Sequence, residues 1–146
     1  MLKILIAEDD STIASLMEDI LVEYGYEVCG IASTVAEAVA LARTHRPDLA
    51  VIDLRLANNG LGTEIAAQLG ELGHLGVLYI TGASQAILTA TNGHARLAKP
   101  FRDTELVRSL EIVTELLSSG LASPPFPRGF HLLPVAAAPS SLGWSG

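Results

Sequence analysis

The chain has 146 residues and a net charge of −7 at pH 7, with 9 Lys and Arg against 16 Asp and Glu. This length can bury one hydrophobic core and is too short for two ordinary domains. So few basic residues exclude the positive stripe that a nucleic-acid backbone requires. Although 49% of the residues are hydrophobic, no apolar run approaches the roughly 20 residues of a membrane-spanning helix. We therefore expect a single soluble domain that binds neither nucleic acid nor membrane.

Two further features bear on the compartment. The opening MLKILIAEDD lacks the basic, apolar and cleavable layout of a secretory signal. The chain has a single cysteine, Cys29, which excludes an internal disulfide and is typical of a reducing compartment. We expect a cytoplasmic protein.

Short apolar runs alternate with helical patterns along the chain. The predicted strands are 2–7, 26–32, 49–54, 76–80 and 96–98. The predicted helices are 12–24, one capped by Ser33 or Thr34 that runs to about 45, then 63–72, 84–91 and 103–118. Five strands that alternate with five helices predict a parallel sheet with helices on both faces, the doubly wound α/β class.

The end of the chain has a different composition. Residues 119–146 are rich in Gly, Ser and Pro and show no helical or strand periodicity. We therefore expect a folded domain at 1–118 and a flexible tail with little fixed structure at 119–146.

Four predicted strands end in residues that can carry chemistry. These residues are Glu8, Asp9 and Asp10 after the first strand, Asp53 on the third, Thr81 after the fourth and Lys99 after the fifth. In open α/β sheets, ligands bind beyond the carboxyl ends of the strands, so we expect these side chains to converge on one pocket. Carboxylates held that close together raise one another's pKa or require a cation.

The residue types indicate phosphoryl transfer. Mg²⁺, or Mn²⁺ in its place, prefers oxygen ligands, which Asp9, Asp10 and Asp53 can supply. Asp53 is then the candidate nucleophile toward phosphorus, because the metal neutralises charge on the phosphoryl oxygens. Lys99 adds a second positive charge, and the Thr81 hydroxyl can bond a phosphoryl oxygen. Each motif alone has an ordinary explanation, such as acids that complement a helix dipole, so their coincidence at four strand ends carries the prediction.

Four motifs resemble those of bacterial response-regulator receiver domains: ILIAEDD, LAVIDLRL, YITG and LAKPF. The resemblance covers residues 1 to about 117. It implies a flavodoxin-like fold with strand order 2-1-3-4-5 and a cis peptide before Pro100. It also implies Mg²⁺-dependent phosphorylation of Asp53 by a histidine kinase or phosphotransfer protein, with the backbone carbonyl of Arg55 as a further metal ligand.

Two departures from the receiver pattern concern the output surface. Arg96 stands three positions before Lys99, where receivers usually have an aromatic residue. Its side chain is either an exposed polar group on an edge strand or a group that contacts a partner or an acid such as Glu105. The stretch between Thr81 and Lys99 is also about one helical turn shorter than usual, which would shorten the fourth helix. We expect Thr81 and Arg96 to act as switch residues on an altered output surface.

Three functions are compatible with this pattern. The first is a stand-alone signalling switch that catalyses only its own phosphorylation and dephosphorylation and acts through an unknown downstream protein, with a homodimer left open. The second is a phosphorylation-independent binding module or a phosphate sink. A hydrolase of the aspartyl phosphatase type is disfavoured, because its nucleophile lies on the first strand with a second acid two positions later, whereas Asp9 and Asp10 are adjacent.

Overall fold

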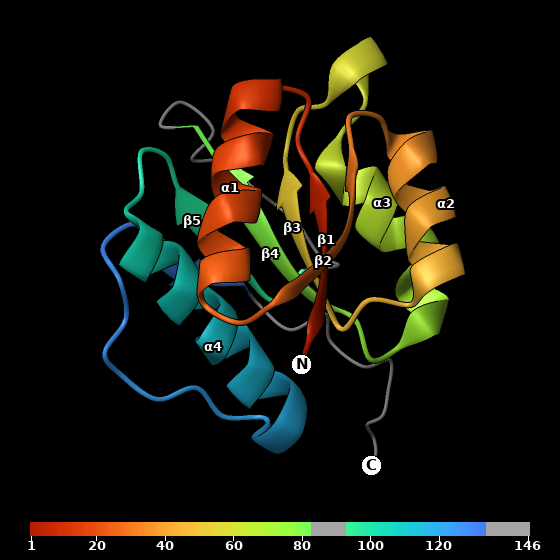
Figure 1. The fold of residues 1–146 in the computed structure, drawn as a ribbon. Coiled ribbons are helices and arrows are strands. Elements are labelled where there is room, and N and C mark those ends of the chain that lie inside the picture. Colours follow the sequence, from red (N-terminus) through yellow and green to blue (C-terminus); the bar gives the residue numbers. More distant parts are fainter. Residues whose placement is uncertain (83–92, 134–146) are drawn as a thin grey trace.

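In the computed structural model, which describes residues 1–82 and 93–133, the strands form one sheet in the order β2-β1-β3-β4-β5-β6 (Figure 1). The first five strands are parallel, and β6 is antiparallel to β5. The strands are β1 (Lys3–Ala7), β2 (Glu27–Ala32), β3 (Leu49–Asp53), β4 (Gly76–Thr81), β5 (Ala95–Ala98) and β6 (Phe130–Leu132). The flavodoxin-like order 2-1-3-4-5 is confirmed, with one added strand.

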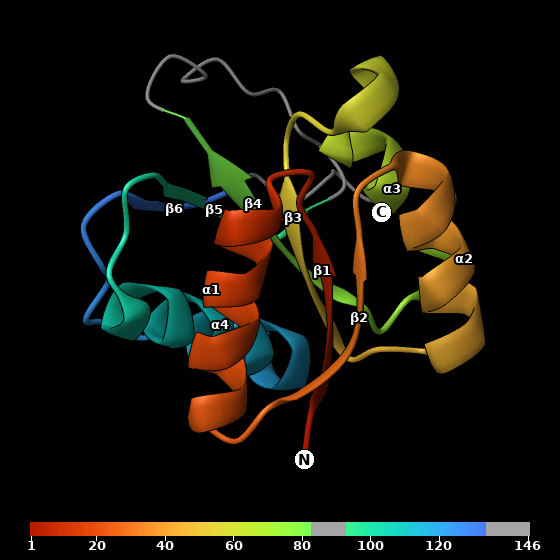
Figure 2. The same ribbon diagram turned by 45° about the horizontal axis from the view of Figure 1, so that its top comes forward.

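Helices cover both faces of this sheet. Helices α1 and α4 lie against one face and α2 and α3 against the other (Figures 1 and 2). The α-helices within the described residues are α1 (Ser11–Glu23), α2 (Val35–His45), α3 (Gly62–Gln68) and α4 (Asp103–Ser119). The helix predicted at 84–91 lies outside the described residues. None of the described helices has the length and apolar character needed to cross a bilayer.

Helices α1 and α2 begin where a side chain caps their free N–H groups. The Asp10 carboxylate accepts hydrogen bonds from the backbone N–H groups of Thr12 (2.9 Å) and Ile13 (3.2 Å), which starts α1 directly after β1. Thr34, one of the two predicted caps, accepts from the N–H of Glu37 at 3.1 Å and starts α2. These short strand-to-helix connections place the carboxyl ends of the strands beside the first turns of the helices.

The central strand β3 is buried along its whole length, from Leu49 to Asp53. It lies between β1 and β4 and is covered by helices on both sides, so both of its faces contact core side chains. A strand in this position reads as a continuous apolar run, which LAVI supplies. Asp53 is the first polar residue of the strand and lies where the core ends.

The segment after α4 differs from the prediction of a flexible tail. Residues 130–132 form β6, paired with β5, and Phe130 is buried in the core on the α1 and α4 side of the sheet. Leu133 is buried in the core on the opposite side. Burial of two large apolar side chains offsets part of the entropy of ordering this segment. The remainder of the predicted tail, 134–146, lies outside the described residues.

The added strand excludes one of the two interpretations of Arg96, that of an exposed group on an edge strand. β6 covers that edge of β5, and Arg96 pairs in register with His131. The side chain of Arg96 is half-buried.

The opposite edge of the sheet is irregular. β2 pairs with β1 only, and the register shifts between Ile4, opposite Val28, and Leu5, opposite Gly30. The shift leaves Cys29 as an extra residue, which is the pattern of a β-bulge.

Tyr79 of β4 is completely buried, and its hydroxyl has no hydrogen-bond partner within the described residues. We expect Tyr79→Phe to raise the free energy of unfolding near neutral pH by about 1 kcal/mol, because an unsatisfied buried hydroxyl is removed. Burial also raises the pKa of Tyr79 to about 12 from 10.0. The folded state therefore resists ionisation, and the stability present below pH 10 is lost as the pH rises from 10 through 12, by up to about 3 kcal/mol.

Urea unfolding of the wild type and Tyr79→Phe between pH 8 and 12 measures both effects. The advantage of the Phe variant should grow with pH above 10. The matched control is Tyr24→Phe, since Tyr24 is 45% exposed, and it should follow the wild type. A loss of stability in Tyr79→Phe at pH 8 would show that the hydroxyl has a favourable partner.

Candidate functional site

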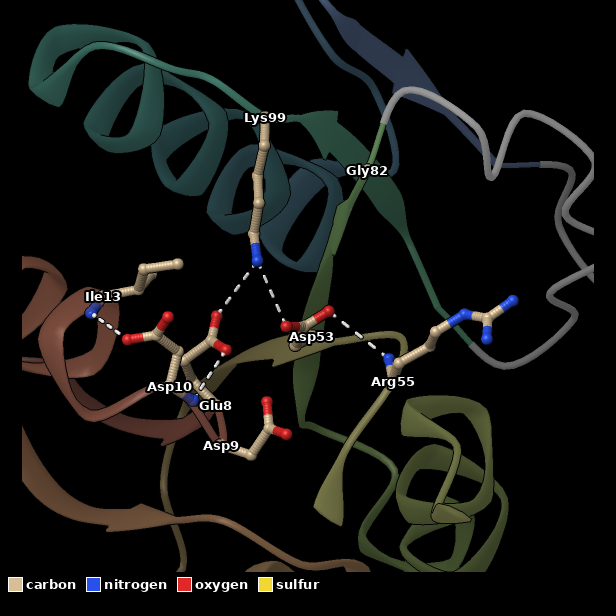
Figure 3. Close-up of a pocket in the computed structure, with 8 residues that line it drawn as sticks. All are labelled: Glu8, Asp9, Asp10, Ile13, Asp53, Arg55, Gly82 and Lys99. Carbon is tan, nitrogen blue, oxygen red and sulfur yellow. Dashed lines mark hydrogen bonds and ion pairs between the residues drawn. The ribbon is translucent and has the colours of Figure 1, made fainter.

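A lysine and two buried carboxylates meet at the carboxyl ends of three strands. Glu8 follows β1, Asp53 ends the neighbouring β3, and Lys99 follows β5. The Lys99 Nζ lies 3.2 Å from Asp53 Oδ2 and 3.3 Å from Glu8 Oε1 (Figure 3). Glu8 and Asp53 are 2% and 8% exposed. One ammonium group therefore bridges two largely buried acids.

This cluster forms one side of a cavity of about 420 Å³ at the edge of the sheet. Asp9 and Asp10 come from the turn between β1 and α1, and Arg55 comes from the turn after β3. The lining residues are Glu8, Asp9, Asp10, Ile13, Asp53, Arg55, Gly82 and Lys99. The convergence predicted from the four strand ends is present for three of them, with β4 contributing through Gly82.

Three of the acids can share one cation. Carboxylate oxygens of Glu8, Asp9 and Asp53 all lie within 4.8 Å of one another. An all-oxygen set with one exposed member, Asp9, suits Mg²⁺, which keeps part of its water shell and is held by few carboxylates. The residues present therefore fit a hard divalent cation.

Asp10, which the sequence predicts as a ligand, lines the cavity but is not one of these three acids. Its carboxylate oxygen Oδ1 is used by the first N–H groups of α1, and Figure 3 shows it turned toward Ile13. Glu8, which the sequence did not predict as a ligand, is one of the three: its Oε1 accepts from Lys99, and its Oε2 accepts from the N–H of Asp10 at 3.2 Å. The sequence held a signal for this, because an Asp directly before Ser-Thr and a helical apolar pattern is a typical N-cap.

Burial and neighbouring charges shift the pKa values of Glu8 and Lys99. Burial, together with the hydrogen bond and charge of Asp53, raises the pKa of Glu8 to about 7. Burial lowers the pKa of Lys99, but the charges of Asp53 and Glu8 outweigh it and raise that pKa overall. Lys99 therefore stays cationic beside the acids.

The other predicted site residues contribute through their backbone. The N–H of Arg55 donates to Asp53 Oδ1 at 3.3 Å, while its side chain extends away from the carboxylates (Figure 3). Thr81 is buried, and its carbonyl accepts from the N–H of Lys99 at 2.7 Å. Its side chain does not line the cavity within the described residues. The predicted cis peptide between Lys99 and Pro100 is present.

Comparison with known proteins agrees with this geometry. Residues 4–111 match the model of the response regulator receiver domain. The chain belongs to this family. It is 32% identical over 114 residues to the transcriptional regulatory protein PdtaR of Mycobacterium tuberculosis, covering 75% of this chain and 55% of that protein. It is 25% identical over 117 residues to the chemotaxis protein CheY of Thermotoga maritima, covering 77% of this chain and 98% of that protein.

The fold is similar to that of solved receivers. The signal receiver domain of a modulated diguanylate cyclase from Desulfovibrio desulfuricans superposes with a TM-score of 0.71 at 30% identity, covering 83% of this chain and 99% of that chain. The chain spans about half the length of PdtaR.

Proposed function

We propose that this receiver is a phosphorylation switch of a two-component system and that Asp53 accepts the phosphoryl group. The observation that carries the proposal is the contact of Asp53 with Lys99, beside carboxylates that can share a cation with it. Asp53 lines the cavity, through which a phosphoryl donor would reach it. The donor would be the phosphohistidine of a histidine kinase or a phosphotransfer protein in the cytoplasm, and the output would pass to a further protein.

In the proposed reaction an Asp53 oxygen forms a bond to phosphorus while the bond from phosphorus to the donor breaks, and the donor atom keeps that electron pair. Lys99 turns from Asp53 to an oxygen of the transferred group, so its charge stabilises the product. Glu8 and Asp9, with the backbone carbonyl of Arg55, would hold Mg²⁺. When bound, the cation neutralises the charge on the phosphoryl oxygens. The Thr81 hydroxyl is the proposed switch donor to the product.

The test uses acetyl phosphate, a small phosphoryl donor, with the intact chain. Mass spectrometry should find one added phosphoryl group when Mg²⁺ is present and none after chelation. Asp53→Asn should abolish the addition. The matched control is Asp19→Asn, an exposed acid of α1, which should be modified like the wild type. An unmodified wild-type chain, or equal modification of Asp53→Asn, would refute the proposal.

Beryllofluoride, which mimics an aspartyl phosphate, separates the switch from a binding module that ignores phosphorylation. In a switch, beryllofluoride with Mg²⁺ should change the amide spectrum at Thr81, Ala98 and Arg96, beyond the residues that touch the anion. Light scattering with and without the anion also tests the homodimer. Changes confined to the cavity would favour a phosphate sink.

A further inference from the structure

Residues 121–133, which we call the strap, lie beyond the part of the chain that matches the receiver family, 4–111. α4 ends at Gly120, which has a left-handed conformation with φ of 77°. From there the chain passes along the outside of α4 and returns to the sheet as β6 (Figures 1 and 2). The strap therefore covers parts of α4 and β5, two elements that precede it in the chain.

The strap binds β5 as an antiparallel strand. The N–H of Ala98 donates to the carbonyl of Gly129 at 3.0 Å, and the N–H of Leu133 donates to the carbonyl of His94 at 3.1 Å. Between them, Phe130 pairs with Leu97. The backbone groups along this edge of β5 are thus bonded by a segment that lies far along the chain.

Phe130 and Gly129 of the strap show which residue types fit against the edge of β5. Phe130 is 7% exposed and belongs to the same core cluster as Leu97 and Leu106. Gly129 has φ of 79°, and a Cβ there would lie 3.3 Å from the Cβ of Ala98. A side chain at this position is both strained and crowded. The N–H of Phe130 donates to the carbonyl of Pro127 at 3.1 Å, so Gly129 belongs to a turn that leads into β6. The edge of β5 therefore accepts a strand that begins with an aromatic residue and follows directly on a glycine turn.

The rest of the strap is held by polar contacts at the surface. Arg108 of α4 donates from Nε to the carbonyl of Pro125 (3.1 Å) and from Nη2 to the carbonyl of Ser123 (2.6 Å). Glu115 accepts from the N–H and hydroxyl of Ser123 at 3.1 and 3.0 Å. Exposed polar contacts contribute little free energy each, and segments with few buried apolar contacts open at low cost. Beyond the pairing of β6 with β5, its buried anchors Phe130 and Leu133, and the packing of Phe126 and Ala122, the strap is held only by such surface contacts.

We propose that the strap is a displaceable cover and that the edge of β5 is a docking groove for a partner protein. The partner contributes a segment in which a glycine turn leads directly into a strand that begins with an aromatic residue. These two residues replace Gly129 and Phe130, and the strand adds to the sheet in antiparallel orientation. The strap itself demonstrates the fit. The docking edge ends at Ala98, and the next residue, Lys99, contacts the proposed acceptor Asp53. The docking edge and the proposed phosphorylation site are therefore adjacent in the chain. The inference concerns another surface and stands whether or not Asp53 is phosphorylated.

The experiment measures binding of a fluorescent peptide with the sequence of residues 121–133 to the full chain. The built-in strap competes with the peptide, so the wild type should bind weakly. Phe130→Ala in the protein removes the competing anchor and should tighten binding about tenfold or more. Leu132→Ala is the matched control, because Leu132 is 44% exposed, and it should bind like the wild type. A peptide carrying Phe130→Ala or Gly129→Ala should bind the opened protein at least tenfold more weakly.

A second variant guards against misfolding of Phe130→Ala. Arg108→Ala removes surface contacts of the strap, together with the ion pairs of Arg108 to Glu111 and Glu115 of α4, and leaves Phe130 intact. It should also tighten peptide binding, with faster hydrogen exchange at the Ala98 amide. The proposal would be overturned if the peptide bound with equal affinity to the wild type and to the Phe130→Ala, Leu132→Ala and Arg108→Ala proteins. Equal affinity of the wild-type and Phe130→Ala peptides for the opened protein would also overturn it. Binding that shifts amides of β2 and leaves those of β5 unchanged would also overturn it.

Discussion

Gly62→Ala is expected to lower the free energy of unfolding by about 3 kcal/mol, the upper part of the range for overpacked cores. Gly62 opens α3, and a Cβ there would lie 2.3 Å from the carbonyl oxygen of Asp53 and 2.6 Å from Cγ2 of Ile52. The first contact is with backbone and cannot be relieved by turning a side chain. α3 or the end of β3 must move. Urea unfolding followed by circular dichroism measures the loss.

The same substitution should slow phosphorylation, because the displaced backbone is that of the proposed acceptor. The control is Gly70→Ala in the 3-10 helix Gly70–Leu72, where a Cβ meets nothing within 4 Å. That variant should unfold within about 0.5 kcal/mol of the wild type and be modified at the same rate. Wild-type stability of Gly62→Ala would show that α3 is not packed on β3 as described.

Glu8→Gln is expected to weaken Mg²⁺ binding by about tenfold or more, while Asp10→Asn leaves it nearly unchanged. The reason is geometric, since the oxygens of Glu8 lie with those of Asp9 and Asp53 and the Asp10 carboxylate caps α1. Removing one negative ligand from a site with few carboxylates reduces its affinity for a hard cation. Calorimetric titration with Mg²⁺ measures both constants.

The unfolding free energies of two Asp10 variants test its role as the cap of α1. Asp10→Ala should cost about 1 kcal/mol of unfolding free energy through loss of the cap, whereas Asp10→Asn keeps a capping oxygen and should cost little. If Asp10→Asn weakened Mg²⁺ binding as much as Glu8→Gln, the ligand set first predicted from the sequence would be restored.

The sheet could be predicted from the sequence because each of its first five strands has a local signature. The apolar run before Asp53 is typical of a buried strand, and the alternation of strands with helices favours parallel pairing. The positions of Asp53 and Lys99 followed from the same rule, since both directly end strands. The contact between Lys99 and Asp53 is therefore a result that the sequence indicated in advance.

Two features depended on information that the local pattern lacks. Among the three adjacent acids, either Glu8 and Asp9 or Asp9 and Asp10 could be the pair that faces the cation. Only the directions of the side chains show that Glu8 faces Lys99 while Asp10 faces α1. β6 has three residues, in a segment whose prolines and glycines obscure the apolar residues. Its partner, β5, lies more than 30 positions earlier in the chain. Such pairing is decided by tertiary packing.

The bulge at Cys29 and the strap act at opposite edges of one sheet. An open edge is a template on which a second chain can add strands without limit. In β2 the extra residue breaks the regular spacing of hydrogen-bonding groups that such growth needs, whereas regular β5 is protected only by being covered. Opening the strap thus exposes the edge of β5 and carries a risk of aggregation. In the cell this risk would be lowest if the strap left β5 only as the partner's strand replaced it.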